Sequence, residues 1–186
     1  DKKNNKFIIG HFGLLNHLRN PKMFWKVLHD LCDDNPSFNE KLEIRLSGNI
    51  DTEVLQSITQ HYHLKNKLKL LGYLSHKEVL KEYNNSSVLL LLLFNSESGK
   101  GNYPGKIFEY FAAKRHILAF GPQESDTKEL INKTKSGTYY SYKEENFKQE
   151  ILDLFNNKKE FESSKEIMSF TRKKLTKKLS DLLDKM

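Results

Sequence analysis

Short apolar runs alternate with segments of helical periodicity along nearly the whole chain. Six runs, most of them ended by glycine or serine, predict β-strands at residues 6–10, 42–46, 68–71, 88–94, 116–120 and 137–140. Each is followed by a segment whose apolar residues recur every three or four positions, which is typical of an amphipathic helix. A strand followed by a helix, repeated six times, predicts a parallel sheet with helices on both faces. Because parallel crossovers are right-handed, we expect an α/β domain with a Rossmann-like, doubly wound sheet of about six strands.

Two kinds of local signal refine this expectation. The run Val88–Phe94 is apolar at every position, so the strand should be covered on both faces and lie in the centre of the sheet. Two helix starts carry capping signals: Asn20 stands before Pro21, and Ser75 forms a capping box with Glu78.

Composition narrows the class of protein. The chain has 186 residues, and 37% of them are hydrophobic, which is enough for an ordered core. The single cysteine, Cys32, excludes a disulfide framework and suits a reducing compartment. The longest apolar run is far shorter than the ~20 residues that a membrane-spanning helix needs. The chain opens at Asp1 with a polar stretch, which we interpret as a cut inside a longer polypeptide.

Loops that follow the carboxyl ends of strands are the expected place for a ligand in such a sheet. The first of them, residues 10–19, lacks the G-x-G-x-x-G pattern, which disfavours a nicotinamide dinucleotide. Its Arg19 precedes a helix start, where an anion is favoured, so Arg19 is either a phosphate clamp or a surface arginine. In the third loop, Tyr73 either lines a nucleobase or packs on the sheet.

The fourth loop, residues 95–105, carries the strongest chemical signal. It ends at Gly105, where a helix opens whose amides, together with Lys106, could hold a diphosphate. One turn later, Glu109 could accept hydrogen bonds from two ribose hydroxyls. The alternatives are a solvated lysine at position 106 and, at position 109, a carboxylate that complements the helix dipole.

Other familiar sites are disfavoured. The same loop is not a P-loop, because Phe94 and Gly101 stand where that motif requires Gly and then Ser or Thr. No Asp-x-Asp pair is present to hold a divalent ion on a diphosphate, and the histidines lack partners at ligand spacing. We therefore expect no metal site and no cofactor.

Three motifs follow one another along the chain: Lys69-Leu-Leu-Gly72-Tyr-Leu-Ser75-His-Lys-Glu78, then Pro104-Gly105-Lys106-Ile-Phe-Glu109-Tyr110, then His116-Ile-Leu-Ala-Phe-Gly121-Pro122. Their order and spacing resemble the C-terminal, donor-binding half of a GT-B glycosyltransferase, closest to the family 4 group (glycosyl transferases group 1). The resemblance covers nearly the whole chain. It implies an enzyme that transfers a sugar from a nucleoside-diphosphate donor without a metal ion.

The resemblance also implies roles for residues of this chain. The implied donor-binding residues are Glu109 for the ribose, Lys106 and Gly105 for the diphosphate, Gly72 and Tyr73 for the base, and Arg19 for the leaving diphosphate. Gly101 stands where the family commonly carries a second glutamate. Glu97 and Gly13 are therefore the candidates for contacts on the sugar side, and the stereochemical outcome stays open.

Two alternatives to a transferase also stay open. A sugar-nucleotide epimerase of the UDP-N-acetylglucosamine type shares the GT-B architecture, and a non-catalytic nucleotide-binding domain shares the sheet. A domain of the response-regulator shape is disfavoured, because no predicted strand ends in an aspartate.

The end of the chain is expected to be a separate element. We predict a donor-nucleotide-binding domain over residues 1–169 and a helix over residues 170–186, with an apolar stripe formed by Leu175, Leu179, Leu182 and Met186. The resemblance implies that this helix packs back on an N-terminal acceptor domain that the chain lacks. Without that domain we expect little or no sugar transfer.

Charge adds a hypothesis about partners. The chain has 31 Lys and Arg against 24 Asp and Glu, a net charge of +7. The one dense basic cluster consists of Arg172, Lys173, Lys174, Lys177 and Lys178. It either meets anionic lipid or is a solvated helix face, and nucleic acid is not expected because no aromatic residues are interleaved for base stacking. We expect a cytoplasmic protein of bacterial polysaccharide or glycoconjugate synthesis, with a glycan or lipid-linked sugar as acceptor and peripheral contact with the inner face of the membrane.

Overall fold

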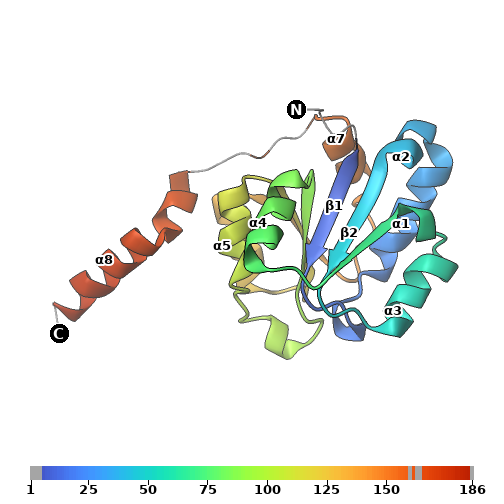
Figure 1. Cartoon of the computed structure of the whole chain (residues 1–186). Helices are drawn as coiled ribbons and strands as arrows, with labels where there is room; N and C mark the ends of the chain where they lie inside the picture. The colour runs from blue at the N-terminus through green and yellow to red at the C-terminus, as the bar shows by residue number, and fades with distance from the viewer. Residues whose placement is uncertain (1–5, 159–160, 162–164, 185–186) are drawn as a thin grey trace.

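The computed structural model describes residues 6–158, 161 and 165–184. One parallel sheet contains β1 (Phe7–Phe12), β2 (Leu42–Ser47), β3 (Leu68–Gly72), β4 (Val88–Leu92), β5 (His116–Gly121) and β6 (Gly137–Ser141). The strand order is β3-β2-β1-β4-β5-β6, so the direction of winding reverses between β1 and β4. The predicted doubly wound α/β fold is confirmed, and its switch point lies at the carboxyl ends of β1 and β4 (Figure 1).

Helices connect and cover the strands. They are α1 (Lys22–Asp34), α2 (Pro36–Lys41), α3 (Thr52–Gln56) with a π-helical turn at Ser57–His61, α4 (His76–Asn85), α5 (Lys106–Ala113), α6 (Asp126–Thr134), α7 (Lys148–Phe155) and α8 (Arg172–Leu183). Short 3-10 segments lie at His17–Arg19, Lys65–Lys67, Glu97–Gly99 and Lys165–Phe170. Each predicted strand is present within two residues of its expected bounds.

The core consists of two layers of buried side chains, one on each face of the sheet. Apolar residues of α1, α2, α3 and α7 pack on one face, and those of α4, α5 and α6 pack on the other. β4 serves both layers, since Leu90 and Leu92 point into the first and Leu89 and Leu91 into the second. This confirms that the all-apolar run is a central strand.

Two local predictions at the start of the chain need correction. β1 does not stop at Gly10 but continues to Phe12. A Cβ at position 10 would lie 2.5 Å from the Phe12 ring, so the missing side chain makes room for that ring within the strand. Asn20 does not cap α1: Pro21 is the N-cap residue, and Asn20 Oδ1 instead accepts a hydrogen bond from Trp25 Nε1 at 2.8 Å. The capping box of Ser75 and Glu78 at α4 is confirmed.

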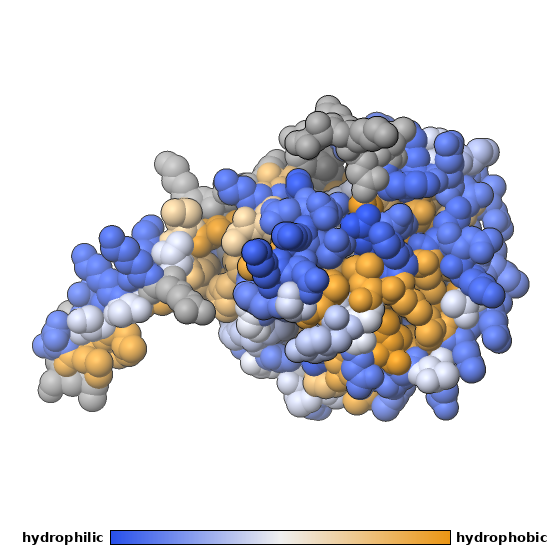
Figure 2. Space-filling view, in the orientation of Figure 1, coloured by the Kyte–Doolittle hydropathy of each residue, from blue (hydrophilic) through white to orange (hydrophobic). Residues whose placement is uncertain are grey.

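α8 stands apart from the layered body (Figure 1). Its Leu175, Leu179 and Leu182 are 41%, 57% and 61% exposed, and Figure 2 shows hydrophobic atoms on one side of this helix and hydrophilic atoms on the other. Met186, the last residue of the predicted stripe, lies outside the described residues, as does the side chain of Arg172. The packing of this helix on another domain stays a prediction. Among the described helices, none combines the length and apolar character needed to cross a bilayer.

Candidate functional site at the carboxyl ends of β1 and β4

Two glycine turns form the floor of the site. Gly13, which follows β1, has φ +145°, and its N–H donates to Ser47 O at 2.7 Å. Gly48, which follows β2, has φ +108°, and a Cβ there would lie 2.6 Å from Gly13 O. Side chains at either position would be strained and would separate the two backbones. The loops after β1 and β2 are therefore fixed against each other, backbone to backbone.

Lys106 lies at the first position of α5, beneath the Gly13 turn. Its Nζ donates to Phe12 O at 3.1 Å, and a Cβ at Gly13 would lie 3.2 Å from that Nζ. Burial, and then the charge of Arg19, lower the pKa of this ammonium group to about 8. Lys106 is thus a confined cation at a helix N-terminus, not a solvated surface lysine.

Arg19 brings a second positive charge to the same place. Its guanidinium lies 3.9 Å from the centroid of the Phe94 ring, and its Nε is buried without a hydrogen-bond partner. Burial lowers the pKa of this group, although it stays far above neutrality. The backbone holds the arrangement, because Asn95 N donates to Leu18 O at 2.8 Å and ties the loop of Arg19 to the loop after β4. This fixed position argues against a freely solvated surface arginine.

Glu109 lies one turn after Lys106 on the same side of α5. Its Oε2 accepts a hydrogen bond from Tyr83 Oη at 3.2 Å, and its Oε1 is 4.0 Å from His76 Nε2. The side chain is 37% exposed, so the carboxylate is both anchored and accessible. A carboxylate that served only the helix dipole would need neither contact.

Gly72 ends β3, and Tyr73 follows it at the side of the site. Tyr73 is 94% exposed, which contradicts the alternative that its ring packs on the sheet. Gly72 has φ +64° and accepts hydrogen bonds at its carbonyl from Ser47 Oγ and Gly48 N. The turn that presents the Tyr73 ring to solvent is therefore well supported.

On the other side, Glu97 belongs to a charged cluster. Lys100 Nζ lies 2.9 Å from Glu97 Oε2 and 3.7 Å from Glu124 Oε2. Around them a cavity of about 470 Å³ opens at the ends of β4, β5 and β6, lined by Asn95, Ser96, Glu97, Lys100, Gly121, Pro122, Gln123, Glu124, Ser141, Tyr142 and Lys143. Gly13 is not among the lining residues, so the two sugar-side candidates lie at different parts of the site.

Sequence reasoning missed His11. This residue is fully buried in β1, with Nδ1 3.1 Å from Leu90 O and Nε2 3.2 Å from Leu14 O. Burial, followed by the charge of Lys106, lowers its pKa to about 3, so the ring is neutral and donates one N–H to one of the two carbonyls. The signal was a histidine within an otherwise apolar strand at the switch point. Tyr83 was missed as well, because its position in the apolar stripe of α4 indicated a core residue and gave no sign of a role for its hydroxyl group.

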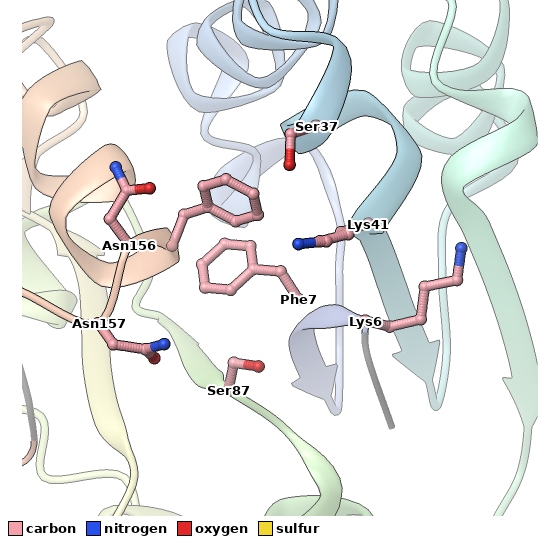
Figure 3. Close-up of a pocket in the computed structure, with 8 residues that line it drawn as sticks. Lys6, Phe7, Ser37, Lys41, Ser87, Asn156 and Asn157 are labelled. Carbon is pink, nitrogen blue, oxygen red and sulfur yellow. The ribbon is translucent and has the colours of Figure 1, made fainter. Parts of the chain in front are cut away.

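In the described part of the chain, no three His, Cys, Asp or Glu side chains group closely enough to hold a metal ion. A second cavity of about 470 Å³ lies at the opposite, amino end of the sheet, where Figure 3 shows Phe7 between Lys41, Ser87 and Asn156. The carboxyl end of the sheet thus differs from the amino end by its polar loops, its glycine turns and its confined cations.

Comparison with protein families decides the identity of this fold. The model for "glycosyl transferases group 1" matches residues 1–174. The chain belongs to the glycosyl transferases group 1 family. The comparison with curated proteins gives no match.

Solved structures agree with the C-terminal half of a GT-B fold. WaaG, a glycosyltransferase involved in lipopolysaccharide biosynthesis, matches with TM-score 0.63 and 11% identity over 82% of this chain and 38% of WaaG. S. aureus TarM, in complex with Fondaparinux, alpha-GlcNAc-glycerol and UDP, matches with TM-score 0.62 and 17% identity over 82% of this chain and 29% of TarM. The C-terminal domain of LpcC, a group 1 family protein from Francisella tularensis, matches with TM-score 0.56 and 16% identity over 81% of this chain and 74% of that one. The chain therefore spans less than half the length of WaaG and TarM.

Proposed function

We propose that this chain is the donor-binding domain of a glycosyltransferase, which holds a nucleoside-diphosphate sugar at the carboxyl ends of β1 and β4 while the sugar passes to an acceptor. The observation that carries the proposal is that Lys106 is confined at the Gly13 turn within range of the Arg19 charge, with Glu109 one helical turn away. Membership in the group 1 family and the UDP held by TarM support it.

A diphosphate would supply the negative charge that balances the two cations of this site. Lys106 and Arg19 are like charges held together, and within the described residues no carboxylate pairs with either. A diphosphate placed at the start of α5 receives the Lys106 ammonium group, the Arg19 guanidinium and the positive end of the helix dipole. The same groups stabilise the negative charge that grows on the diphosphate as the glycosidic bond to the sugar breaks. No metal ion is required for that step.

The remaining contacts follow from the position of the diphosphate. Glu109 accepts hydrogen bonds from the ribose hydroxyls with its accessible oxygen atoms, and the Tyr73 turn lies where a base can stack. The donor sugar extends toward Glu97 and the cavity beside it. Hydroxyl groups suit that cavity, because carboxylate, amide and ammonium groups line it.

The acceptor and the membrane belong to the same proposal. We place acceptor binding in a part of the enzyme outside these residues, and we take the acceptor to be a glycan or a lipid-linked sugar of bacterial polysaccharide synthesis in the cytoplasm. At 3.6 residues per turn of α8, Lys173 and Lys177 lie opposite the leucine row, and Lys174 and Lys178 lie at its margins. This basic face suits anionic lipid, at about 1 kcal/mol per cation near the surface. Sedimentation with anionic but not neutral vesicles, lost after substitution of these lysines by glutamine, would support that contact.

Calorimetry with UDP, GDP, ADP and dTDP tests the central proposal. At least one nucleotide should bind, and Glu109→Ala should weaken its binding by ~1–3 kcal/mol. Binding of none at millimolar ligand would overturn the proposal. A Glu109→Ala variant with normal affinity and a lower melting temperature would show instead that this carboxylate only stabilises α5.

A further inference from the structure

Tyr83 lies behind the carboxylate of Glu109 and comes from a different helix. It belongs to α4, the helix that follows the Tyr73 turn, and it is only 3% exposed. Its hydroxyl group donates to Glu109 Oε2 at 3.2 Å. Burial, and next the Glu109 carboxylate, raise the pKa of this phenol, so it stays a protonated donor at every physiological pH.

Packing leaves the Tyr83 ring little freedom. The ring meets Phe12 edge to face at a centroid distance of 5.2 Å and Tyr110 edge to face at 4.9 Å. Phe12 is also the residue whose carbonyl oxygen accepts the hydrogen bond from Lys106 Nζ. The end of β1 thus supports the two donor-site residues of α5 together: Lys106 through a backbone carbonyl and Glu109 through the Tyr83 ring.

His76, which also faces Glu109, does not hold the carboxylate in place. His76 Nε2 is 4.0 Å from Oε1, beyond hydrogen-bond distance, and the His76 side chain is 70% exposed. Of the two groups that face the carboxylate among the described residues, Tyr83 alone is fixed by packing and within hydrogen-bond distance. With Oε2 held there, Oε1 and one lone pair of Oε2 stay available to two neighbouring hydroxyl groups.

We propose that Tyr83 is a positioning residue that orients the Glu109 carboxylate toward the ribose, and that it thereby sets the preference of the site for ribose over deoxyribose nucleotides. This inference rests on the proposed function. It predicts that the Tyr83 hydroxyl contributes to affinity only when the ligand has the ribose hydroxyls and the protein has the Glu109 carboxylate. A hydroxyl that merely stabilised the fold would affect every nucleotide alike.

The test measures dissociation constants of Tyr83→Phe for the nucleoside diphosphate that the wild-type protein binds best and for its 2′-deoxy form. The variant keeps the ring and removes one oxygen atom. We expect the ribonucleotide to bind about three- to tenfold more weakly, as for the net contribution of one ordinary hydrogen bond, and the deoxynucleotide to lose less. In a Glu109→Gln background, Tyr83→Phe should have a smaller effect on ribonucleotide binding than in the wild type.

Tyr110→Phe is the matched control. Tyr110 is buried beside Tyr83, but its hydroxyl group lies 3.5 Å from Leu90 O and not at Glu109, so the ratio of the two dissociation constants should stay at the wild-type value. An unchanged ratio in Tyr83→Phe, or additive effects of Tyr83→Phe and Glu109→Gln, would overturn the inference while nucleotide binding itself upheld the proposed function. A wild-type protein that bound no nucleotide would overturn both.

Discussion

Polar groups at the two ends of the parallel sheet differ in whether they have partners within the protein. At the amino end, His116 Nε2 lies 3.1 Å from Glu150 Oε1, and the Thr138 hydroxyl group donates to the same carboxylate; the side chains of His116 and Glu150 are nearly buried. At the carboxyl end, Lys106 and Arg19 repel each other, and Arg19 Nε has no partner. Polar groups that satisfy one another stabilise the fold, whereas like charges held together cost stability and favour an anionic ligand.

Cavities at the two ends sharpen the contrast. The amino-end cavity has a floor of aromatic rings, Phe7 and Phe155, whose centroids are 5.5 Å apart. Its lysine Lys6 donates to Glu40 O at 2.8 Å, and Ser87 Oγ accepts from Ile8 N at 3.1 Å. These contacts join the start of β1 to α2 and to the residue before β4. Both cavities have a volume of about 470 Å³, so cavity size alone does not identify the proposed binding site.

The largest expected effect compares one lysine from each end. Lys106→Met removes a cation at the proposed diphosphate site and should weaken nucleotide binding by ~1.5–3 kcal/mol, or about ten- to hundredfold. Lys41→Met, at the amino-end cavity, should leave affinity unchanged. Calorimetry measures both, and the melting temperature of Lys106→Met should not fall, because a confined charge is replaced by an apolar chain. Equal affinities of the two variants would contradict the assigned positions of site and scaffold.

Acid should destabilise the protein through His11. Its folded pKa of about 3 lies below the ordinary value of 6.5, so the unfolded state binds the proton first and stability falls with pH from about 6.5 toward 3. Between pH 7 and pH 5 this residue should cost about 2 kcal/mol of unfolding free energy. Urea titrations of His11→Asn should lack that component, whereas those of His17→Gln, an exposed histidine of the loop after β1, should keep it. A wild-type pH dependence retained in His11→Asn would refute this origin.

Lys106 should link pH to binding and to stability with opposite signs. Its pKa of about 8 means that the free site loses this charge as pH rises, so nucleotide affinity should fall up to about tenfold between pH 7 and pH 9. Its folded pKa is below the ordinary 10.5, so stability of the unliganded protein should rise across pH 8 to 10.5. Calorimetry and urea unfolding across this range measure the two slopes. Lys106→Met is the reference, since neither slope should retain the lysine component in it.

The smallest expected effect is at Tyr73. Tyr73→Ala should weaken nucleotide binding by about 1 kcal/mol, or roughly fivefold, through loss of base stacking. The melting temperature should stay the same, because the ring is 94% exposed. Tyr73→Phe keeps the stacking surface and should bind like the wild type. If Tyr73→Ala binds normally, the base does not lie on this turn.

Local patterns were sufficient for the architecture. The apolar runs and their helical partners predicted six strands in a parallel sheet, and the all-apolar run at Val88 correctly predicted a strand that serves both layers of the core. These patterns are reliable because burial on one face or on two imposes a spacing along the chain itself. The Ser75 capping box is local in the same sense, whereas the Asn20 prediction was wrong because Trp25 competed for that side chain.

The site needed the tertiary structure. The sequence identified three candidate ligand-binding residues, Lys106, Glu109 and Arg19. Their order along the chain was equally compatible with a ligand-binding role and with a solvated or helix-stabilising one. Their confinement depends on contacts across the sheet: Phe12 O under Lys106, the Phe94 ring under Arg19 and the Tyr83 hydroxyl behind Glu109. His11 and Tyr83 looked like parts of apolar elements because His11 Nδ1 and Tyr83 Oη meet partners far away in the sequence. Periodicity reports which side of an element is buried, but a hydrogen bond or a shifted pKa depends on what the fold places opposite.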